Sequence, residues 1–194
     1  MPKTIFTGFG PNITSADTKT AWGLIFKPWK WRAGNFVNKA EDWLKEYFQT
    51  KFSFVFDSGR TSLHYALKSL EIGESDEVIV QSYTCMVVSN AIVWTGAKPV
   101  YVDVGSDFNI DVDDLNKKIT QKTKVIIIQH TFGIPADIEG ILETAKEHDI
   151  KIIEDCAHAL GAKYNNKLLG TFGDIGMFSF GSDKVISCVR GGGV

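Results

Sequence analysis

The chain has 194 residues, of which 44% are hydrophobic and 23% charged, and its net charge is −2. This composition supports a sizeable core, which excludes disorder as the main state, and it lacks the basic surplus typical of nucleic-acid-binding proteins. Three cysteines are too few for a disulfide framework and no apolar run approaches the ~20 residues of a membrane span, so we expect a cytoplasmic protein with no nucleic-acid or membrane partner.

Residues 1–50 differ in character from the rest, and we predict that they form an N-terminal segment. The basic and aromatic stretch over 27–32 is interpreted as a surface segment whose tryptophans dock on a core or a partner. A nucleic-acid-binding role is disfavoured because two or three cations cannot neutralise a phosphate footprint. Between Phe36 and Phe48, apolar residues recur at helical spacing, which predicts an amphipathic helix.

From residue 51 onward, short apolar runs alternate with helical patterns. The run Val125–Ile128 is apolar on both faces, which is typical of a strand inside a sheet that is covered on both sides. Asp111 and Asp137 are each placed to cap a helix, the second of which reaches about residue 148. The alternation predicts an α/β fold, a mostly parallel sheet with helices on both faces. We expect strands over 52–56, 77–81, 98–102, 124–129, 151–154 and 175–180, and further helices over 61–70 and 84–94.

A first candidate site is the turn over 57–62, Asp-Ser-Gly-Arg-Thr-Ser, between a predicted strand and a predicted helix. Gly59 allows close approach of the backbone to a ligand. The N–H groups of Gly59, Arg60 and Thr61 would open the helix and favour an anion there. Phosphate binding and an ordinary capped turn both remain open for this turn taken alone.

Two further candidate sites follow later strands. Asp155 ends a buried strand, where parallel sheets bind ligands, and a carboxylate there can hold a heterocyclic nitrogen protonated or simply cap a helix. His158, in the same turn, is either a structural histidine or a donor to a ligand oxygen. The strand over 175–180 delivers Ser179 and then Lys184, which is either a Schiff-base amine or a solvated surface lysine. Dinucleotide, Walker A, His-Glu-x-x-His and Cys-x-x-Cys motifs are all absent from the sequence, so we expect no metal site.

In this order, the three turns resemble those of the DegT/DnrJ/EryC1/StrS family of pyridoxal-phosphate-dependent aminotransferases. The resemblance covers most of the chain from about Phe36, including the stretches 73–80, 96–100, 133–137 and 170–176. It implies the large domain of a fold type I enzyme, with pyridoxal phosphate as cofactor. We therefore expect residues 51–194 to be part of that cofactor-binding domain in a truncated chain, with the C-terminal small domain absent.

The resemblance also implies roles for individual residues. Lys184 is similar to the lysine that forms the Schiff base, and Asp155 to the partner of the pyridine nitrogen. His158 stands where many members have Gln, near the phenolic oxygen of the ring.

The phosphate site of the family is similar to Ser179 together with the backbone of Gly59 and Arg60. Arg60 replaces a common Thr and is expected to add a cation there. Cys85 lies in the segment that covers one face of the cofactor ring, where many members carry an aromatic residue. Tyr83 is a poor substitute for that aromatic residue, because adjacent helical positions do not face the same way.

The function implied is transfer of an amino group from a glutamate-type donor to a nucleotide-linked keto sugar, in surface polysaccharide or secondary-metabolite sugar biosynthesis. The resemblance also implies a homodimer with active sites at the subunit interface. Two alternatives are another pyridoxal-phosphate-dependent sugar-modifying enzyme such as a dehydratase, and a truncated regulatory homologue without catalysis. Dehydrating relatives typically lack the lysine, so Lys184 favours transamination, although activity of these 194 residues by themselves stays open.

Overall fold

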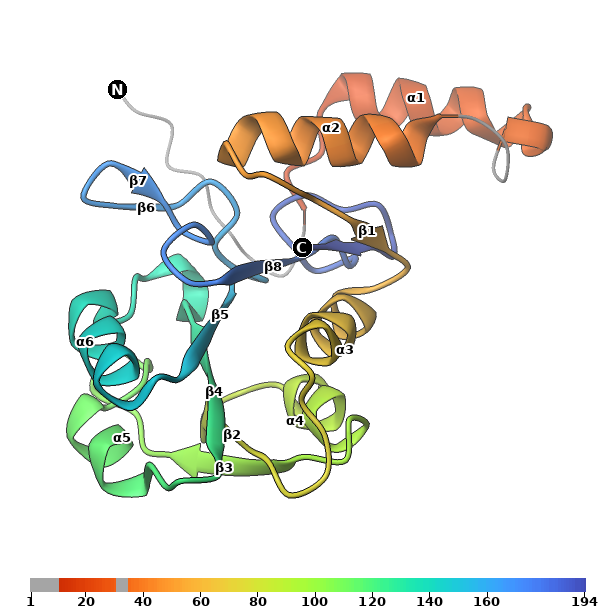
Figure 1. The fold of residues 1–194 in the computed structure, drawn as a ribbon. Helices are drawn as coiled ribbons and strands as arrows, with labels where there is room; N and C mark the ends of the chain where they lie inside the picture. Colours follow the sequence, from red (N-terminus) through yellow and green to blue (C-terminus); the bar gives the residue numbers. More distant parts are fainter. Residues whose placement is uncertain (1–10, 31–34) are drawn as a thin grey trace.

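A seven-stranded sheet in the order β1-β9-β8-β5-β4-β2-β3 forms the middle layer of the computed structural model, which describes residues 11–30 and 35–194 (Figure 1). Strands β3, β2, β4, β5 and β8 run parallel to one another, whereas β9 is antiparallel to both β8 and β1. The predicted α/β fold with a mostly parallel sheet is confirmed. The strands are β1 (Val55–Phe56), β2 (Glu77–Gln81), β3 (Lys98–Val102), β4 (Thr123–Gln129), β5 (Lys151–Asp155), β8 (Ile175–Ser179) and β9 (Gly192–Gly193).

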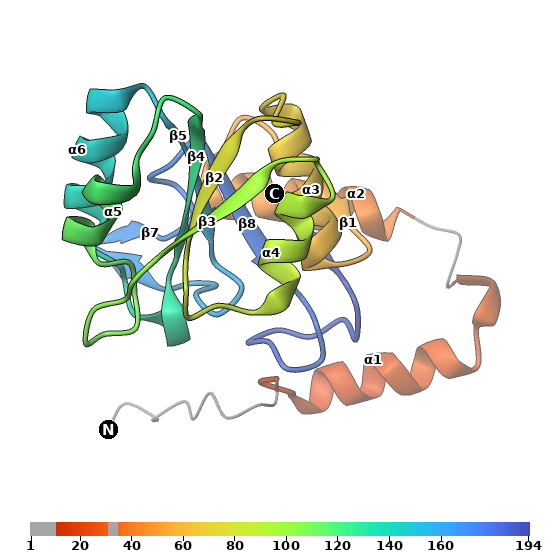
Figure 2. The same ribbon diagram turned by 90° about the horizontal axis from the view of Figure 1, so that it is seen from below.

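Helices cover both faces of this sheet, as predicted (Figures 1 and 2). On one side lie α3 (Gly59–Ser69) and α4 (Met86–Val93), and on the other α5 (Val112–Lys118) and α6 (Ile138–His148). Successive side chains of a strand point to opposite faces, so Val125 and Ile127 of β4 fill the core under α3 and α4. Ile126 and Ile128 fill the core under α5 and α6. The apolar run in β4 is therefore buried on both faces.

The helices begin where side chains satisfy their first backbone N–H groups. The Asp111 side chain accepts from Asp114 N at 2.9 Å and that of Asp137 from Gly140 N at 3.1 Å, so both predicted caps are confirmed. Helix α3 begins earlier than predicted, because Ser58 caps it. Helix α4 begins later, at Met86.

The N-terminal segment contributes the predicted helix α2 (Phe36–Phe48) and a helix that was not predicted, α1 (Ser15–Ile25). The ring of Phe48 stacks on that of Phe178 in β8, with centroids 4.4 Å apart, which attaches α2 to the sheet. Helix α1 has a capping box, the reciprocal pair of bonds between Thr14 and Asp17, and none of its residues is buried. Figure 2 shows it standing apart from the sheet.

The basic aromatic stretch includes a short 3-10 helix, η1 (Pro28–Lys30), in which Trp29 is 67% exposed. The other tryptophan and the arginine of that stretch, at 31 and 32, lie outside the described residues. Two smaller features were not predicted: η2 (Thr131–Gly133) after β4, and a hairpin of β6 (Lys163–Tyr164) and β7 (Lys167–Leu168). Within the described ranges, no helix is both long and apolar enough to cross a membrane.

Candidate functional site

Lys184 and His158 meet at the carboxyl ends of the neighbouring strands β8 and β5. Lys184 Nζ lies 3.1 Å from His158 Nε2 and 3.3 Å from Asp183 Oδ2. Partial burial of the ring lowers the pKa of His158, and the positive charge of Lys184 lowers it further. A neutral ring can accept at Nε2, whereas an ammonium group only donates. The sheet therefore joins the predicted lysine and histidine through a hydrogen bond from Nζ to Nε2.

Asp155 is buried at the end of β5, beside this pair. Burial raises the pKa of its carboxyl, while the hydrogen bond from Ala157 N to Oδ1, at 2.9 Å, and the charges of His158 and Lys184 act to lower it. An ionised Asp155 is thus unfavourable by itself and is stabilised by positive charge nearby. Such a carboxylate is suited to hold a proton on a cationic ring nitrogen.

Gly59 and Ser179 bring the start of α3 against the end of β8. A Cβ atom at position 59 would lie 2.9 Å from both Cβ and Oγ of Ser179, so glycine is required for this close approach. The first N–H groups of a helix have no acceptor within the helix and favour an anion. Thr61 N already donates to Ser58 Oγ at 3.2 Å, so one of the three amides expected to face an anion serves in the cap.

Arg60 contributes its backbone to the same first turn, but its side chain lies elsewhere. The guanidinium carbon lies 5.5 Å from the ring centroid of Trp94, just beyond α4, and the residue is exposed. The cation that we expected beside Ser179 is therefore directed toward the surface of α4 in this structure.

Cys85 is an exposed free thiol at the N-cap of α4. The neighbouring Thr84 is held in place by a hydrogen bond, in which its Oγ1 donates to Oε1 of Gln129 at 2.6 Å. Gln129 ends β4 and is paired in register with Asp155 of β5. The segment expected to cover the cofactor ring is thus attached to the strand next to Asp155, and Thr84 is excluded from the helix.

Sequence reasoning missed Glu154, which organises the loop beside the site. Its Oε1 accepts from the N–H groups of Phe172 and Gly173 at 2.6 and 2.8 Å, and its Oε2 from Gly170 N and His130 Nε2 at 2.8 and 3.1 Å. Burial raises the pKa of Glu154, but these hydrogen bonds outweigh that effect and hold it below its usual value. The available signal was an acid inside an apolar strand, which requires buried partners.

His130, Glu154 and Cys156 form a buried group whose polar atoms all lie within 4.8 Å of one another. His130 Nδ1 accepts from Ala136 N at 3.2 Å, so the proton is on the Nε2 that faces Glu154. Burial raises the pKa of the Cys156 thiol well above its usual value, which keeps it protonated. The nitrogens of His130 and the oxygens of Glu154 are all engaged in hydrogen bonds, so hydrogen bonding accounts for the cluster.

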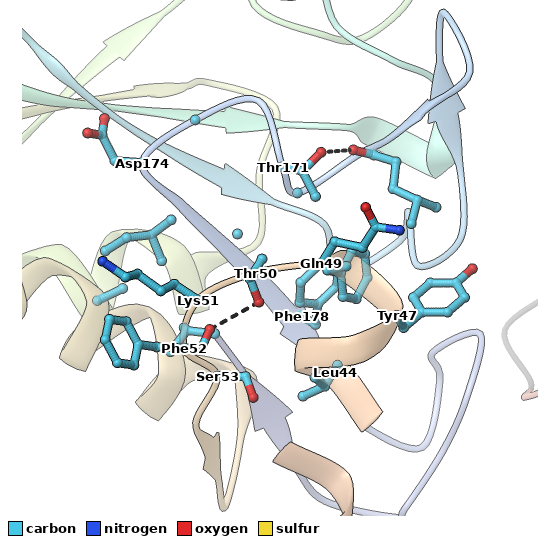
Figure 3. Close-up of a pocket in the computed structure, with 18 of the residues that line it drawn as sticks. Leu44, Tyr47, Gln49, Thr50, Lys51, Phe52, Ser53, Thr171, Asp174 and Phe178 are labelled. Atoms are coloured by element: carbon cyan, nitrogen blue, oxygen red, sulfur yellow. Dashed lines mark hydrogen bonds between the residues drawn. The ribbon is translucent and has the colours of Figure 1, made fainter. Parts of the chain in front are cut away.

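A cavity of about 1150 Å³ lies in another part of the molecule, between the end of α2, α3, β8 and the β6–β7 hairpin. Figure 3 shows Tyr47 and Gln49 at one end of it and Lys51, Phe52 and Asp174 at the other. None of the candidate site residues discussed above is among those that line it. The candidate site is instead the open edge formed by the carboxyl ends of the parallel strands.

An amine, a buried carboxylate and the start of a helix lie at the carboxyl edge of a parallel sheet, which is where α/β proteins of this class commonly bind ligands. The model of the DegT/DnrJ/EryC1/StrS aminotransferase family matches residues 13–194, and the chain belongs to this family. The resemblance found in the sequence is thereby confirmed.

Individual relatives agree with this membership. The GDP-perosamine synthase of Escherichia coli O157:H7 is 39% identical over 185 residues, which are 95% of this chain and 51% of that protein. A UDP-N-acetyl-3-dehydro-alpha-D-glucosamine 3-aminotransferase of Acidithiobacillus ferrooxidans is 44% identical over 138 residues, 71% of this chain and 37% of that one. The chain spans about half the length, or less, of the relatives that it matches.

Solved structures show the same fold. The aminotransferase from Psychrobacter cryohalolentis superimposes with a TM-score of 0.86 at 32% identity, covering 95% of this chain and 47% of that one. A putative sugar aminotransferase from Streptococcus pneumoniae in its PLP form gives a TM-score of 0.84 at 32% identity, covering 95% and 51%. The sheet and its flanking helices are those of the larger enzymes.

Proposed function

We propose that this chain carries the cofactor-binding part of a pyridoxal-phosphate-dependent aminotransferase. The enzyme would transfer an amino group from a glutamate-type donor to a nucleotide-linked keto sugar, in surface polysaccharide or secondary-metabolite sugar biosynthesis. The observation that carries this proposal is the contact of Lys184 with His158 beside the buried Asp155. The names of the relatives, which include GDP- and UDP-linked sugars, support the substrate class.

The residues at the sheet edge fit the parts of the cofactor. Pyridoxal phosphate, when bound, supplies an electron sink for amino-group transfer. Lys184 would hold it through its amine, and Asp155 would keep a proton on the ring nitrogen. The first turn of α3 at Gly59, together with Ser179, would bind the phosphate. Gly59 lets the backbone of α3 lie close to Ser179, and the first N–H groups of a helix have no acceptor within the helix.

The histidine gives the lysine a route for its proton. The neutral Nε2 of His158 lies 3.1 Å from Lys184 Nζ, which is a distance over which a proton is shared or passed. His158 would thereby control the protonation of the amine and orient it toward the ring.

Lys184 also separates this proposal from its alternatives. A dehydratase, GDP-4-keto-6-deoxymannose-3-dehydratase, matches with a TM-score of 0.78 at 28% identity, and a "pleiotropic regulatory protein" of Geobacillus stearothermophilus is 38% identical over 162 residues. Dehydrating members typically lack the lysine, and a regulatory protein needs no amine next to a buried carboxylate. Transamination therefore accounts best for the site.

The remaining proposals concern the setting of the enzyme. We propose a homodimer in which both subunits contribute residues to each active site, as the resemblance implies. We also propose that the chain divides into an N-terminal segment (1–50) and a cofactor-binding part of the large domain (51–194). A cytoplasmic location is supported by the free thiols of Cys85, Cys156 and Cys188, which fit a reducing compartment.

Borohydride trapping tests the proposal. The protein incubated with pyridoxal phosphate and then reduced should carry one covalent label on the peptide that contains Lys184. Lys184→Ala should lose the label, the visible absorbance of the bound cofactor and the half-reaction with glutamate. The control Lys163→Ala, an exposed lysine in β6, should keep all three. A label of normal stoichiometry in Lys184→Ala would show that another amine serves.

A further inference from the structure

Three aromatic side chains are held together in solvent at the carboxyl edge of the sheet. Tyr83, Phe108 and Phe132 are 48%, 47% and 55% exposed and come from the segments that follow β2, β3 and β4. Their ring centroids are 5.3 Å apart for Tyr83 and Phe108, 6.3 Å for Phe108 and Phe132, and 6.4 Å for Tyr83 and Phe132. These three residues are called the aromatic corner below.

The backbone of the aromatic corner is strained. Phe108 has φ 64° and Phe132 has φ 54°, in the left-handed region that bulky side chains rarely adopt. Strain of this kind persists only where the surrounding structure imposes it, and it concentrates at functional sites. The two rings are therefore held in solvent by a backbone conformation that is unfavourable for phenylalanine.

A single buried amide connects the three segments that carry the aromatic corner. Nε2 of Gln81, which is fully buried, lies 2.8 Å from Tyr83 O, 2.9 Å from Phe108 O and 3.0 Å from Oγ1 of Thr131, the residue before Phe132. Thr131 Oγ1 in turn donates to Phe108 O at 2.9 Å. Among the described residues, Oε1 of the same amide has no hydrogen-bond partner. The Gln81 amide thus lies against the backbone of Tyr83 and Phe108 and against the residue before Phe132.

The aromatic corner is continuous with the candidate site. The ring of Phe132 is parallel to that of His158, at an interplanar angle of 1° and a centroid distance of 6.0 Å. His158 is the residue that contacts the Lys184 amine. A ligand whose reacting carbon lies at Lys184 can therefore extend past His158 and reach the corner.

We propose that the aromatic corner binds the base of the nucleotide that carries the sugar substrate. The rings of the corner are inclined to one another by 44° to 78°, so they offer both faces and edges to a planar group. Base stacking on aromatic side chains is strong and needs no hydrogen-bonding groups. This inference rests on the proposed function, since it names the part of the substrate that the enzyme holds away from the reacting carbon.

Titration calorimetry with GDP tests the inference on the cofactor-loaded protein. Phe132→Leu and Phe108→Leu should each raise the Kd for GDP about fivefold or more, because leucine keeps the bulk but removes the π face. Phe132→Tyr should bind GDP like the wild type. The control Phe52→Leu, at an exposed ring that lines the separate cavity, should leave the Kd unchanged. Inorganic pyrophosphate, which has no base, should bind all variants alike, and the cofactor absorbance should be the same throughout.

Several results would overturn the inference. These are an absence of GDP binding by the wild type, an unchanged Kd in both leucine variants, or an equal loss for GDP and pyrophosphate. Light scattering measures the oligomeric state of the same variants. If the leucine variants dissociate into monomers while their Kd for GDP stays the same, the aromatic corner is a contact between subunits and the inference is wrong. Trapping of Lys184 is measured separately, so failure of the proposed function is distinguishable from failure of the base site.

Discussion

Replacing Glu154 by Gln removes one acceptor oxygen from a fully buried position. Each carboxylate oxygen accepts two hydrogen bonds, one pair from Phe172 N and Gly173 N and the other from Gly170 N and His130 Nε2. The amide keeps one oxygen, so its NH₂ group must face two donors. Each hydrogen bond to a charged group is worth about 1.5–3 kcal/mol, which gives a loss of about 3–6 kcal/mol.

Thermal unfolding at neutral pH, followed by circular dichroism, measures this loss. For a chain of this size, 1 kcal/mol shifts Tm by roughly 2–4 °C, so the Tm of Glu154→Gln should fall by about 6–24 °C. Glu147→Gln, the same change at an exposed position of α6, should stay within about 0.5 kcal/mol of the wild type. If Glu154→Gln unfolds at the wild-type temperature, the 170–173 loop does not depend on this carboxylate and the reasoning is wrong.

Three further variants address the cofactor site. Asp155→Asn should keep the cofactor but slow amino transfer tenfold or more, about 1.4 kcal/mol of barrier for each factor of ten, and near-normal turnover would contradict the assignment. Burial raises the pKa of Asp155, so the wild type loses stability as pH rises through that raised value. The free energy of unfolding of Asp155→Asn, measured relative to wild type in urea, should therefore increase over the same pH range. Parallel pH profiles for the two proteins would refute this link between Asp155 and stability. Gly59→Ala, whose Cβ would meet Ser179 at 2.9 Å, should weaken pyridoxal phosphate binding at least tenfold in a fluorescence titration, whereas Gly23→Ala, with nothing within 4 Å, should have no effect. Turnover should fall as pH drops through the lowered pKa of His158, because the protonated ring cannot accept from the lysine, and a similar fall in His158→Gln would argue against this role.

Local sequence signals predicted several of the regular elements well, although only Val55–Phe56 of the strand expected over 52–56 forms. The bounds of α2, β2 and β3 agree with the structure, because apolar periodicity and capping residues act within a few positions of each other. The pair Gly192–Gly193 forms β9 although glycine has low strand propensity, since its place between β1 and β8 is fixed by tertiary packing. No local pattern could reveal that strand.

The candidate site likewise contains residues that the sequence locates and residues whose contacts depend on the tertiary fold. The positions of Asp155 and Lys184 follow from strand ends, which a sequence shows directly. The partners of Glu154 and Gln81 lie on other loops, and only the fold brings those backbone groups to them. Arg60 illustrates the limit for surface residues, because the sequence placed its backbone but not the direction of its side chain toward Trp94.

The pairing of β1 with β9 constrains how this protein is made on the ribosome. Within the described chain, Val55–Phe56 joins the sheet through Gly192–Gly193, which emerge from the exit tunnel long afterwards. During translation, β2 to β5 can assemble with their helices, while β1 must wait for β9. Val55 and Phe56 are meanwhile accessible to chaperones and proteases, and docking of residues 192–193 gives them their neighbour in the sheet.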